Sequence, residues 1–393
     1  MRKLIAISVV FALIAGAAFA DTAVSGSLSV RAKLLADTLN DVDNTAYAVG
    51  EVETAYVQLS GTNDDGTFGG LIRLRGNDGT SKFHRVFAWW KPIPQLQIWL
   101  GQDPDGKFGP YNAWTFFQGQ ESYAHDHDWD AWRAAFPGNW DSFGLAFSIY
   151  PIQGLEVDIV VPMGGISLSN DLTTPTGNSG YVKPWEGLYP GKNFNALWFG
   201  SLQLAVVYGI PDIGKVFLNV IGPGYDIFDS DNKPANYGRL GVAFLLTAVQ
   251  GVDVQVGFST TLPGEVSDYP SNIALIVNYN GEGFGVRFRS RFVLGSGSGA
   301  GANKDYIQIG ADVQPWINLG PLTAYLNIGF IMTDTGAGSV SGVNPVSQFI
   351  LNPYIRMGFG GGSLRFGVLF KDPNLDTDNN ATISVPLIFG YSF

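Results

Sequence analysis

The sequence predicts an all-β protein: a transmembrane, antiparallel, up-and-down β-barrel of 16–18 strands, with 18 preferred. Three observations predict this fold. The chain starts with a segment that has the pattern of a secretory leader. It contains no apolar stretch long enough for a transmembrane helix. Apolar and polar residues alternate in many segments of about ten residues.

The composition excludes several other classes of protein. Of 393 residues, 46% are hydrophobic, 13% aromatic and only 15% charged, which excludes intrinsic disorder. The chain has no cysteine, which excludes disulfide scaffolds and thiolate metal sites. The net charge of −11 argues against a basic nucleic-acid-binding face. Low charge and 51 glycines favour one large barrel over several soluble domains.

Residues 1–20 are expected to be a cleaved secretory signal peptide. Arg2 and Lys3 form its basic start, an apolar stretch follows, and Ala18-Phe19-Ala20 has the small-x-small pattern of a cleavage site. The alternative, a membrane-anchoring helix, is disfavoured because the apolar stretch is short. Residues 21–393 are then expected to form a single barrel domain.

Beyond residue 20 the sequence offers no helix that would cross a bilayer. The nearest candidate, Leu197–Ile210, is short and is interrupted by Ser201 and Gln203. Inside a bilayer every backbone N–H and C=O must be paired, so a closed β-barrel is the remaining solution.

Alternation with a period of two locates the strands. In the last segment Ile383, Val385 and Leu387 share one face with three aromatic residues, while Ser384 and Pro386 share the other. The same pattern predicts eighteen strands, near residues 22–35, 49–60, 67–75, 83–90, 95–101, 141–150, 155–161, 196–208, 214–221, 237–248, 252–259, 272–279, 284–294, 305–315, 322–333, 348–359, 363–371 and 381–393.

The predicted connections alternate in length. Each odd-numbered connection is expected to be longer than each even-numbered one, as in a barrel with short periplasmic turns and long external loops. Two of them, 102–140 and 162–195, are expected to fold inward or to form the outer surface. The expected long connections are 36–48, 76–82, 102–140, 162–195, 222–236, 260–271, 295–304, 334–347 and 372–380.

Aromatic residues stand near the ends of the even-numbered strands, where a barrel has its periplasmic aromatic girdle. Four of them, Tyr208, Tyr279, Phe359 and Phe393, fall in the outward register. Tyr150 and Trp316 are one residue out of register, and the register of Trp90 stays open.

The segment Ile383-x-Val385-x-Leu387-x-Phe389-x-Tyr391-x-Phe393 resembles the terminal strand of Gram-negative outer-membrane β-barrel proteins. The resemblance implies that Phe389, Tyr391 and Phe393 form an assembly signal read by the barrel-assembly machinery. It also implies insertion among outer-membrane lipids after export through the secretory pathway.

The predicted strand number and the acidic, aromatic third loop are similar to those of porins. This resemblance implies passive diffusion of small hydrophilic solutes or ions, and a homotrimer as one option for assembly. Two alternatives stay open. The first is a non-conducting, adhesin-like surface barrel whose long loops bind external partners. The second is a soluble, secreted all-β carbohydrate-binding protein.

Charged residues supply the candidate pore lining. Basic residues that alternate with apolar ones are expected to face the lumen, and acidic residues of 102–140 are expected to face them across a constriction. The alternative is that they only pair with each other and brace the wall. The basic candidates are Arg31, Lys33, Arg73, Arg75, Arg287, Arg289, Arg291, Arg365 and Lys371. The acidic candidates are Asp103, Asp105, Glu121, Asp126, Asp128 and Asp130.

The same loop is rich in aromatic residues, which could stack on the apolar faces of sugars and make the channel sugar-selective. The alternative is that they pack the loop against the wall, since aromatic rings dominate burial energetics. These solute-stacking candidates are Tyr111, Trp114, Phe116, Phe117, Tyr123, Trp129 and Trp132.

No metal site, cofactor or enzymatic activity is predicted. His125-Asp126-His127-Asp128 has alternating ligand types but no fixed third ligand, and is interpreted as an exposed polar loop. The chain has neither the G-x-S-x-G nor the H-E-x-x-H motif.

Two expected strands are apolar on both faces. Alternation directs Ala243, Leu245, Ala274 and Ile276 towards the lumen. A water-filled pore does not favour such a lining, so these positions are expected to lie under an inward loop, or the barrel is partly plugged.

Overall fold

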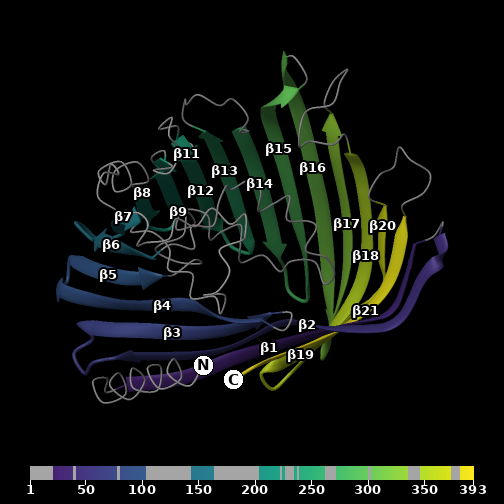
Figure 1. Cartoon of the computed structure of the whole chain (residues 1–393), viewed down its shortest axis with the longest axis horizontal. Helices are drawn as coiled ribbons and strands as arrows, with labels where there is room; N and C mark the ends of the chain where they lie inside the picture. Colours follow the sequence, from purple (N-terminus) through teal and green to yellow (C-terminus); the bar gives the residue numbers. More distant parts are fainter. Residues whose placement is uncertain are drawn as a thin grey trace.

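The computed structural model is a single closed antiparallel sheet (Figure 1). Nineteen hydrogen-bonded segments form the wall. Two of these, β19 and β20, continue one strand, so the barrel has 18 strands. The structure describes residues 21–38, 41–77, 80–102, 143–162, 203–221, 224–225, 234–236, 239–261, 271–299, 302–334, 346–372 and 381–393. The predicted leader, residues 1–20, lies outside them.

Strands that are consecutive in the sequence are neighbours in the wall. Its strands are β1 (Asp21–Thr38), β2 (Asp41–Thr62), β3 (Phe68–Asn77), β4 (Thr80–Ile93), β5 (Leu96–Gln102), β6 (Phe143–Ile149), β7 (Leu155–Pro162), β8 (Gln203–Ile210), β9 (Gly214–Ile221), β12 (Arg239–Val249), β13 (Val252–Thr261), β14 (Ser271–Asn280), β15 (Phe284–Gly299), β16 (Ala302–Leu319), β17 (Leu322–Asp334), β18 (Val346–Phe359), β19 (Gly362–Gly367), β20 (Leu369–Asp372) and β21 (Thr382–Ser392). A small hairpin, β10 (Gly224–Tyr225) and β11 (Pro234–Asn236), stands apart from the wall.

The barrel closes where its first and last strands pair. Strand β1 lies antiparallel to β21, with Leu28 opposite Tyr391 and Val30 opposite Phe389. The amide of Gly26 donates to the carbonyl of Phe393 at 2.9 Å, and the amide of Phe393 donates back to Gly26 at 3.1 Å. Every strand of the wall therefore has a neighbour on both sides, and the fold class and strand number predicted from the sequence are confirmed.

The predicted alternation of connection lengths is wrong at three places. Only two residues separate β1 from β2, β3 from β4, and β15 from β16. These strands run further than expected, because backbone pairing continues through polar and glycine-rich sequence. Gly295–Gly299 pairs residue by residue with 302–306, for example, although this segment has no apolar alternation. The expected loops 36–48, 76–82 and 295–304 are therefore largely strand.

The strand formed by β19 and β20 is interrupted at Val368 for a chemical reason. The amide of Val368 donates to the carbonyl of Pro353 at 3.0 Å, but proline has no N–H to return the bond. The side-chain amide of Asn352 donates to the Val368 carbonyl at 3.2 Å instead. Pro386 removes a further donor on the other neighbouring strand, β21.

The turns β2–β3, β4–β5, β6–β7, β8–β9, β12–β13, β14–β15, β16–β17 and β18–β19 lie at one end of the barrel, here called the short-turn end, because successive strands are antiparallel. In the β2–β3 turn Gly66 has φ +66°, a conformation that suits glycine. The hydroxyl of Thr67 donates to Asp65 at 2.6 Å, and the Thr67 amide donates to the same oxygen at 3.0 Å. These two hydrogen bonds lower the pKa of Asp65.

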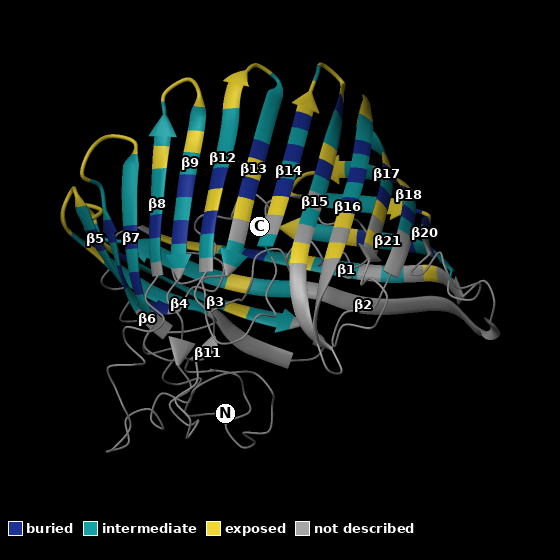
Figure 2. Ribbon diagram, turned by 90° about the horizontal axis from the view of Figure 1, so that it is seen from above, coloured by how far each residue is buried: buried dark blue, intermediate teal, exposed yellow. Residues whose placement is uncertain are grey.

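Many large apolar residues of the wall are exposed. Figure 2 colours the exposed positions yellow, and they alternate with buried ones along the strands. Trp90, whose register the sequence left open, is 52% exposed, and Tyr208, Tyr279, Phe359 and Phe393 are exposed as well. This arrangement inverts that of a soluble protein and suits a lipid environment. None of the described segments is a helix that could cross a bilayer.

Candidate functional site: the inner wall of the barrel

The inner face carries the polar residues that the wall buries. In β14, Asn278 is buried, whereas Ile273 and Tyr279 on the opposite face are exposed. The same alternation runs along most strands, as the banding in Figure 2 shows. Buried polar side chains of the wall are Gln97, Ser148, Asp158, Asn219, Gln255, Asn278, Arg289, Asp312, Gln314, Asn327, Asn352 and Ser384.

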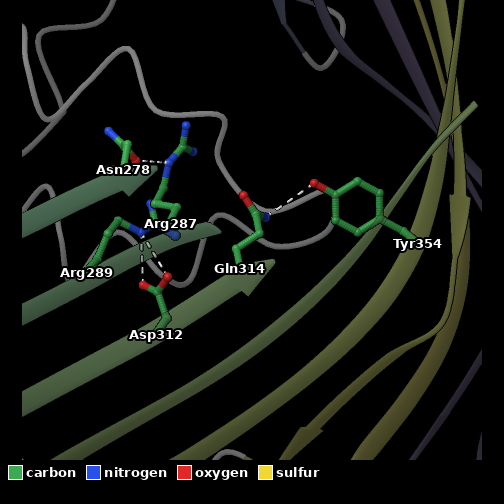
Figure 3. A network of polar contacts seen from close by, with 6 residues as sticks. All are labelled: Asn278, Arg287, Arg289, Asp312, Gln314 and Tyr354. Atoms are coloured by element: carbon green, nitrogen blue, oxygen red, sulfur yellow. Dashed lines mark hydrogen bonds and ion pairs between the residues drawn. The ribbon is translucent and has the colours of Figure 1, made fainter. Parts of the chain in front are cut away.

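A buried ion pair joins β15 to β16 on this face (Figure 3). Arg289 and Asp312 are directly opposite in the strand register. The Arg289 Nε lies 3.0 Å from Oδ1 and 2.9 Å from Oδ2 of Asp312. The two side chains are 6% and 0% exposed. Burial of two charges is tolerated because each is paired. Arg289 was a sequence candidate, whereas its acidic partner was not.

A chain of hydrogen bonds runs beside this pair across three strands. Arg287 donates from Nε to Oδ1 of Asn278 at 2.8 Å, and Asn278 donates from Nδ2 to Asp253 at 2.6 Å. The register places these three residues in one transverse row. The amide of Asn278 thus links a base to an acid, and the row is held rigidly against the wall.

The row continues into an aromatic cluster. Gln314, opposite Arg287, donates from Nε2 to the Tyr354 hydroxyl at 3.3 Å (Figure 3). The ring of Tyr354 stacks on Tyr325 with centroids 4.6 Å apart and planes 5° apart. Trp316 lies next to Tyr325 at 6.4 Å. Trp316 therefore faces inward, in agreement with its misfit to the outward register.

A second group of bases lies on the opposite part of the wall, on β3 and β4. Arg73 donates from Nε and Nη2 to Gln58 at 2.9 and 2.6 Å, and its guanidinium lies 4.4 Å from the centre of the Tyr56 ring. Arg85 stands directly opposite Arg73. The sequence predictions missed Arg85, although it alternates with outward-facing residues of β4 in the same way as the others.

Two more arginines are neighbours near the short-turn end. Arg356 of β18 is directly opposite Arg365 of β19, and both are partly exposed. Arg365 was predicted and Arg356 was missed. Opposed residues on adjacent strands have Cβ atoms about 5 Å apart, so two arginine side chains start from neighbouring positions at this end.

Other candidates lie outside what the structure describes. All acidic and all aromatic candidates of the 102–140 connection fall there, as does the His-Asp-His-Asp segment. The strands include Arg31, Lys33, Arg291 and Lys371, but their side chains are not described. Among the described residues, no group of three His, Asp or Glu side chains could hold a metal ion.

The doubly apolar strands do turn apolar side chains inward. Ala243, Ala274 and Ile276 are each 2% exposed on the inner face. Buried residues thus line much of the inner face of β12–β18, although Arg287, Trp316 and Arg356 on the same face are partly exposed. In contrast, the inward residues of β2–β4, such as Gln58, Arg73 and Trp89, are partly exposed. Access to the lumen is therefore greater along β2–β4 than along β12–β18.

Comparison with known proteins identifies similar folds but no related sequence. No family model and no curated protein matches the sequence. Among solved structures, OpdQ of Pseudomonas aeruginosa matches with a TM-score of 0.56 and 12% identity, covering 95% of this chain and 99% of that one. The outer membrane protein opdK of the same organism matches with a TM-score of 0.54 and 11% identity, covering 94% and 98%. Salmonella typhi OmpF in complex with daunomycin matches with a TM-score of 0.51 and 11% identity, covering 95% and 97%.

These similarities extend over nearly the whole length of both chains. The protein has the porin-like fold of outer-membrane β-barrels. At this level of identity they establish the architecture, and the inner wall has to be interpreted from its own residues.

Proposed function

We propose that the barrel is a passive outer-membrane porin for small hydrophilic solutes. The observation that carries this proposal is the inverted distribution of side chains in a closed 18-strand wall. Polar and charged residues point inward, and large apolar residues are exposed outward. A lipid-facing belt around a polar interior is the arrangement that allows water and solutes to cross. Such transport needs no catalytic group.

The accessible bases favour a path along β2–β4. Arg73 and Arg85 face it, and Arg356 and Arg365 stand near its short-turn end. Rings of one charge sign set ion preference in pores. Replacing Arg356 and Arg365 together by glutamine is expected to shift the reversal potential in a salt gradient towards cation preference. An unchanged reversal potential in a conducting channel would contradict this role.

The experiment that tests the proposal is single-channel recording of the refolded protein in a planar bilayer. Stable open steps are expected. A folded and inserted barrel that shows no open current steps would refute the proposed porin function. Linear sugars added to the same channel test whether the aromatic residues of 102–140 make it sugar-selective, since a stacking row would bind them and block the current transiently.

One observation favours the second candidate, a non-conducting surface barrel. Much of the inner face of β12–β18 is buried, and Asn327 and Asn352 are 0% exposed. A lumen closed at this level would leave the external connections as the functional part. The third option, a soluble carbohydrate-binding protein, is disfavoured by the exposed apolar outer face.

Export and assembly complete the proposal. Residues 1–20 direct secretion, and the aromatic row Phe389, Tyr391 and Phe393 directs assembly. In support, these three residues lie on the outer face, where β21 closes the barrel. Phe393→Ser is expected to lower the folded fraction in the outer membrane, measured by heat-dependent gel mobility, whereas Phe393→Leu should retain more of it. Equal insertion of both variants would contradict the signal. Trimer formation is proposed from the resemblance to porins alone.

A further inference from the structure

A hollow of about 470 Å³ opens in the barrel wall near its short-turn end. It lies where access to the lumen is greater, beside β1–β5. Phe87, Trp89 and Trp99 form one side of it, and Ser60 and Thr62, in the inward register of β2, supply hydroxyl-bearing side chains to the lining. Leu71 and Ala23 also line it. None of the residues lining this hollow is charged.

The aromatic rings are held in place by the wall. The Trp99 indole donates from Nε1 to the Ser148 hydroxyl at 3.0 Å. Its ring also packs against the buried residues Ala146 and Val160. Trp99 therefore has its edge and part of its surface fixed before any solute arrives.

Trp89 is fixed by a glycine. A Cβ atom at Gly69 would lie 2.5 Å from Cε2 and Cζ2 of Trp89, so the indole occupies the space that any other side chain at that position would fill. The centroids of Trp89 and Trp99 are 6.4 Å apart, with planes inclined by 51°. Phe87 lies 5.5 Å from Trp99 at 57°. The three rings are tilted against one another and together form an angled aromatic surface.

The chemistry of the lining selects one kind of ligand. A flat apolar face is needed to cover the rings, and hydroxyl groups are needed to pair with Thr62 and Ser60. A purely apolar ligand would displace water from these partly exposed hydroxyl groups without offering them hydrogen bonds. An ion would find no opposite charge in the lining. A pyranose ring has an apolar C–H face and a hydroxyl rim, and meets both requirements.

We propose that this hollow is a binding subsite for one pyranose ring of a neutral saccharide. The inference rests on the proposed function, because a solute reaches the hollow through the lumen. The subsite is separate from the aromatic residues of 102–140. It would hold the sugar at the periplasmic end of the path.

The test compares two solutes on the full refolded protein. Methyl α-D-glucopyranoside is added to single channels in a planar bilayer, and sorbitol serves as the control because it has the hydroxyl groups without the ring face. The glucopyranoside is expected to lower the current saturably. Sorbitol is expected to lower it only as it lowers the bulk conductivity. Equal, non-saturating effects of the two solutes would overturn the subsite.

Three variants locate the effect. Trp89→Leu and Trp99→Leu are each expected to raise the half-saturating glucopyranoside concentration about tenfold, which corresponds to about 1.4 kcal/mol. Trp90→Leu is the matched control, because this neighbouring indole is 52% exposed on the outer face. An equal effect of all three variants would overturn the assignment. If a ring variant fails to fold, Thr62→Val tests the hydroxyl side, with a weaker loss expected.

The porin and the subsite can fail separately. If the folded barrel shows no open steps, the proposed function fails, and binding is measured by tryptophan fluorescence during titration of the detergent-solubilised barrel. A saturable change that Trp89→Leu removes and Trp90→Leu retains would still support the subsite. If the wild-type barrel shows no saturable fluorescence change, the proposed subsite is wrong. If steps appear without saturable block, the porin stands and the subsite is wrong.

Discussion

Replacing Asp312 by leucine takes away the carboxylate that accepts the Arg289 Nε–H at 2.9 and 3.0 Å. The side chains of this pair are 6% and 0% exposed, so water cannot replace the lost partner without opening the wall. Breaking a buried ion pair by removing one partner costs about 3–5 kcal/mol. We expect the free energy of unfolding of Asp312→Leu to fall by about this amount.

The double variant Arg289→Met/Asp312→Leu removes both charges and should lose much less than Asp312→Leu alone, because apolar replacement of a whole buried pair is often neutral. The assay is equilibrium urea unfolding of the refolded barrel in lipid vesicles, followed by tryptophan fluorescence. The wild type, Asp312→Leu, Arg289→Met and the double variant form a double-mutant cycle, which gives the coupling energy between the two side chains. Val313→Leu, on the other face of the same strand, controls for altered packing. A loss below about 1 kcal/mol for Asp312→Leu, or a double variant as unstable as the sum of the singles, would refute the reasoning.

Two further predictions concern single positions. Gly285→Ala would drive its Cβ into the Trp316 ring and should destabilise the barrel by about 1–3 kcal/mol. Gly358→Ala is the control, because the space around Gly358 is open. The urea midpoints of the two variants are compared, and equal midpoints would contradict the contact between Gly285 and Trp316. Asp65 has a folded pKa below its unfolded value of about 3.9, so its stabilising effect is present above that pH and is lost as the pH falls through the folded pKa. Asp65→Asn should therefore flatten the acid side of the stability profile, and a profile parallel to that of the wild type would contradict the role of the Thr67 hydrogen bonds.

The strands were predictable wherever one face meets lipid. The alternation in 383–393 located β21 and its inward and outward faces, because only a strand gives a period of two. Beyond the apolar belt this signal disappears. The sequence GSGSG at 295–299 carries no alternation, yet it pairs with β16 as regularly as the belt does. Backbone hydrogen bonds form whatever the side chains are. They therefore extend these hairpins through residues that show no apolar–polar alternation.

The candidate site was predictable in part. Alternation predicted that Arg73, Arg287 and Arg365 face inward, and the register of their strands agrees with this orientation. Their role as a pore lining stays a prediction. Alternation was not enough to pair Arg289 with Asp312, which lie 23 residues apart in the sequence. Their pairing depends on the register between β15 and β16, which the pattern of one strand does not contain. Arg356 and Arg85 were missed although their own strands carried the same alternation. The hollow beside Trp89 was also missed, since five separate strands contribute to it.

The extended hairpins give the barrel an uneven rim. In β15 the last exposed apolar residue is Leu294, and five further residues, Gly295–Gly299, continue the strand. At about 3.3 Å per residue this adds about 16 Å of wall beyond the apolar belt. The β1–β2 hairpin likewise continues past Leu34 to Thr38. If this end of the barrel faces away from the cell, as the proposed function requires, these two hairpins carry backbone-paired wall beyond the lipid-facing residues, into the region where external partners would arrive.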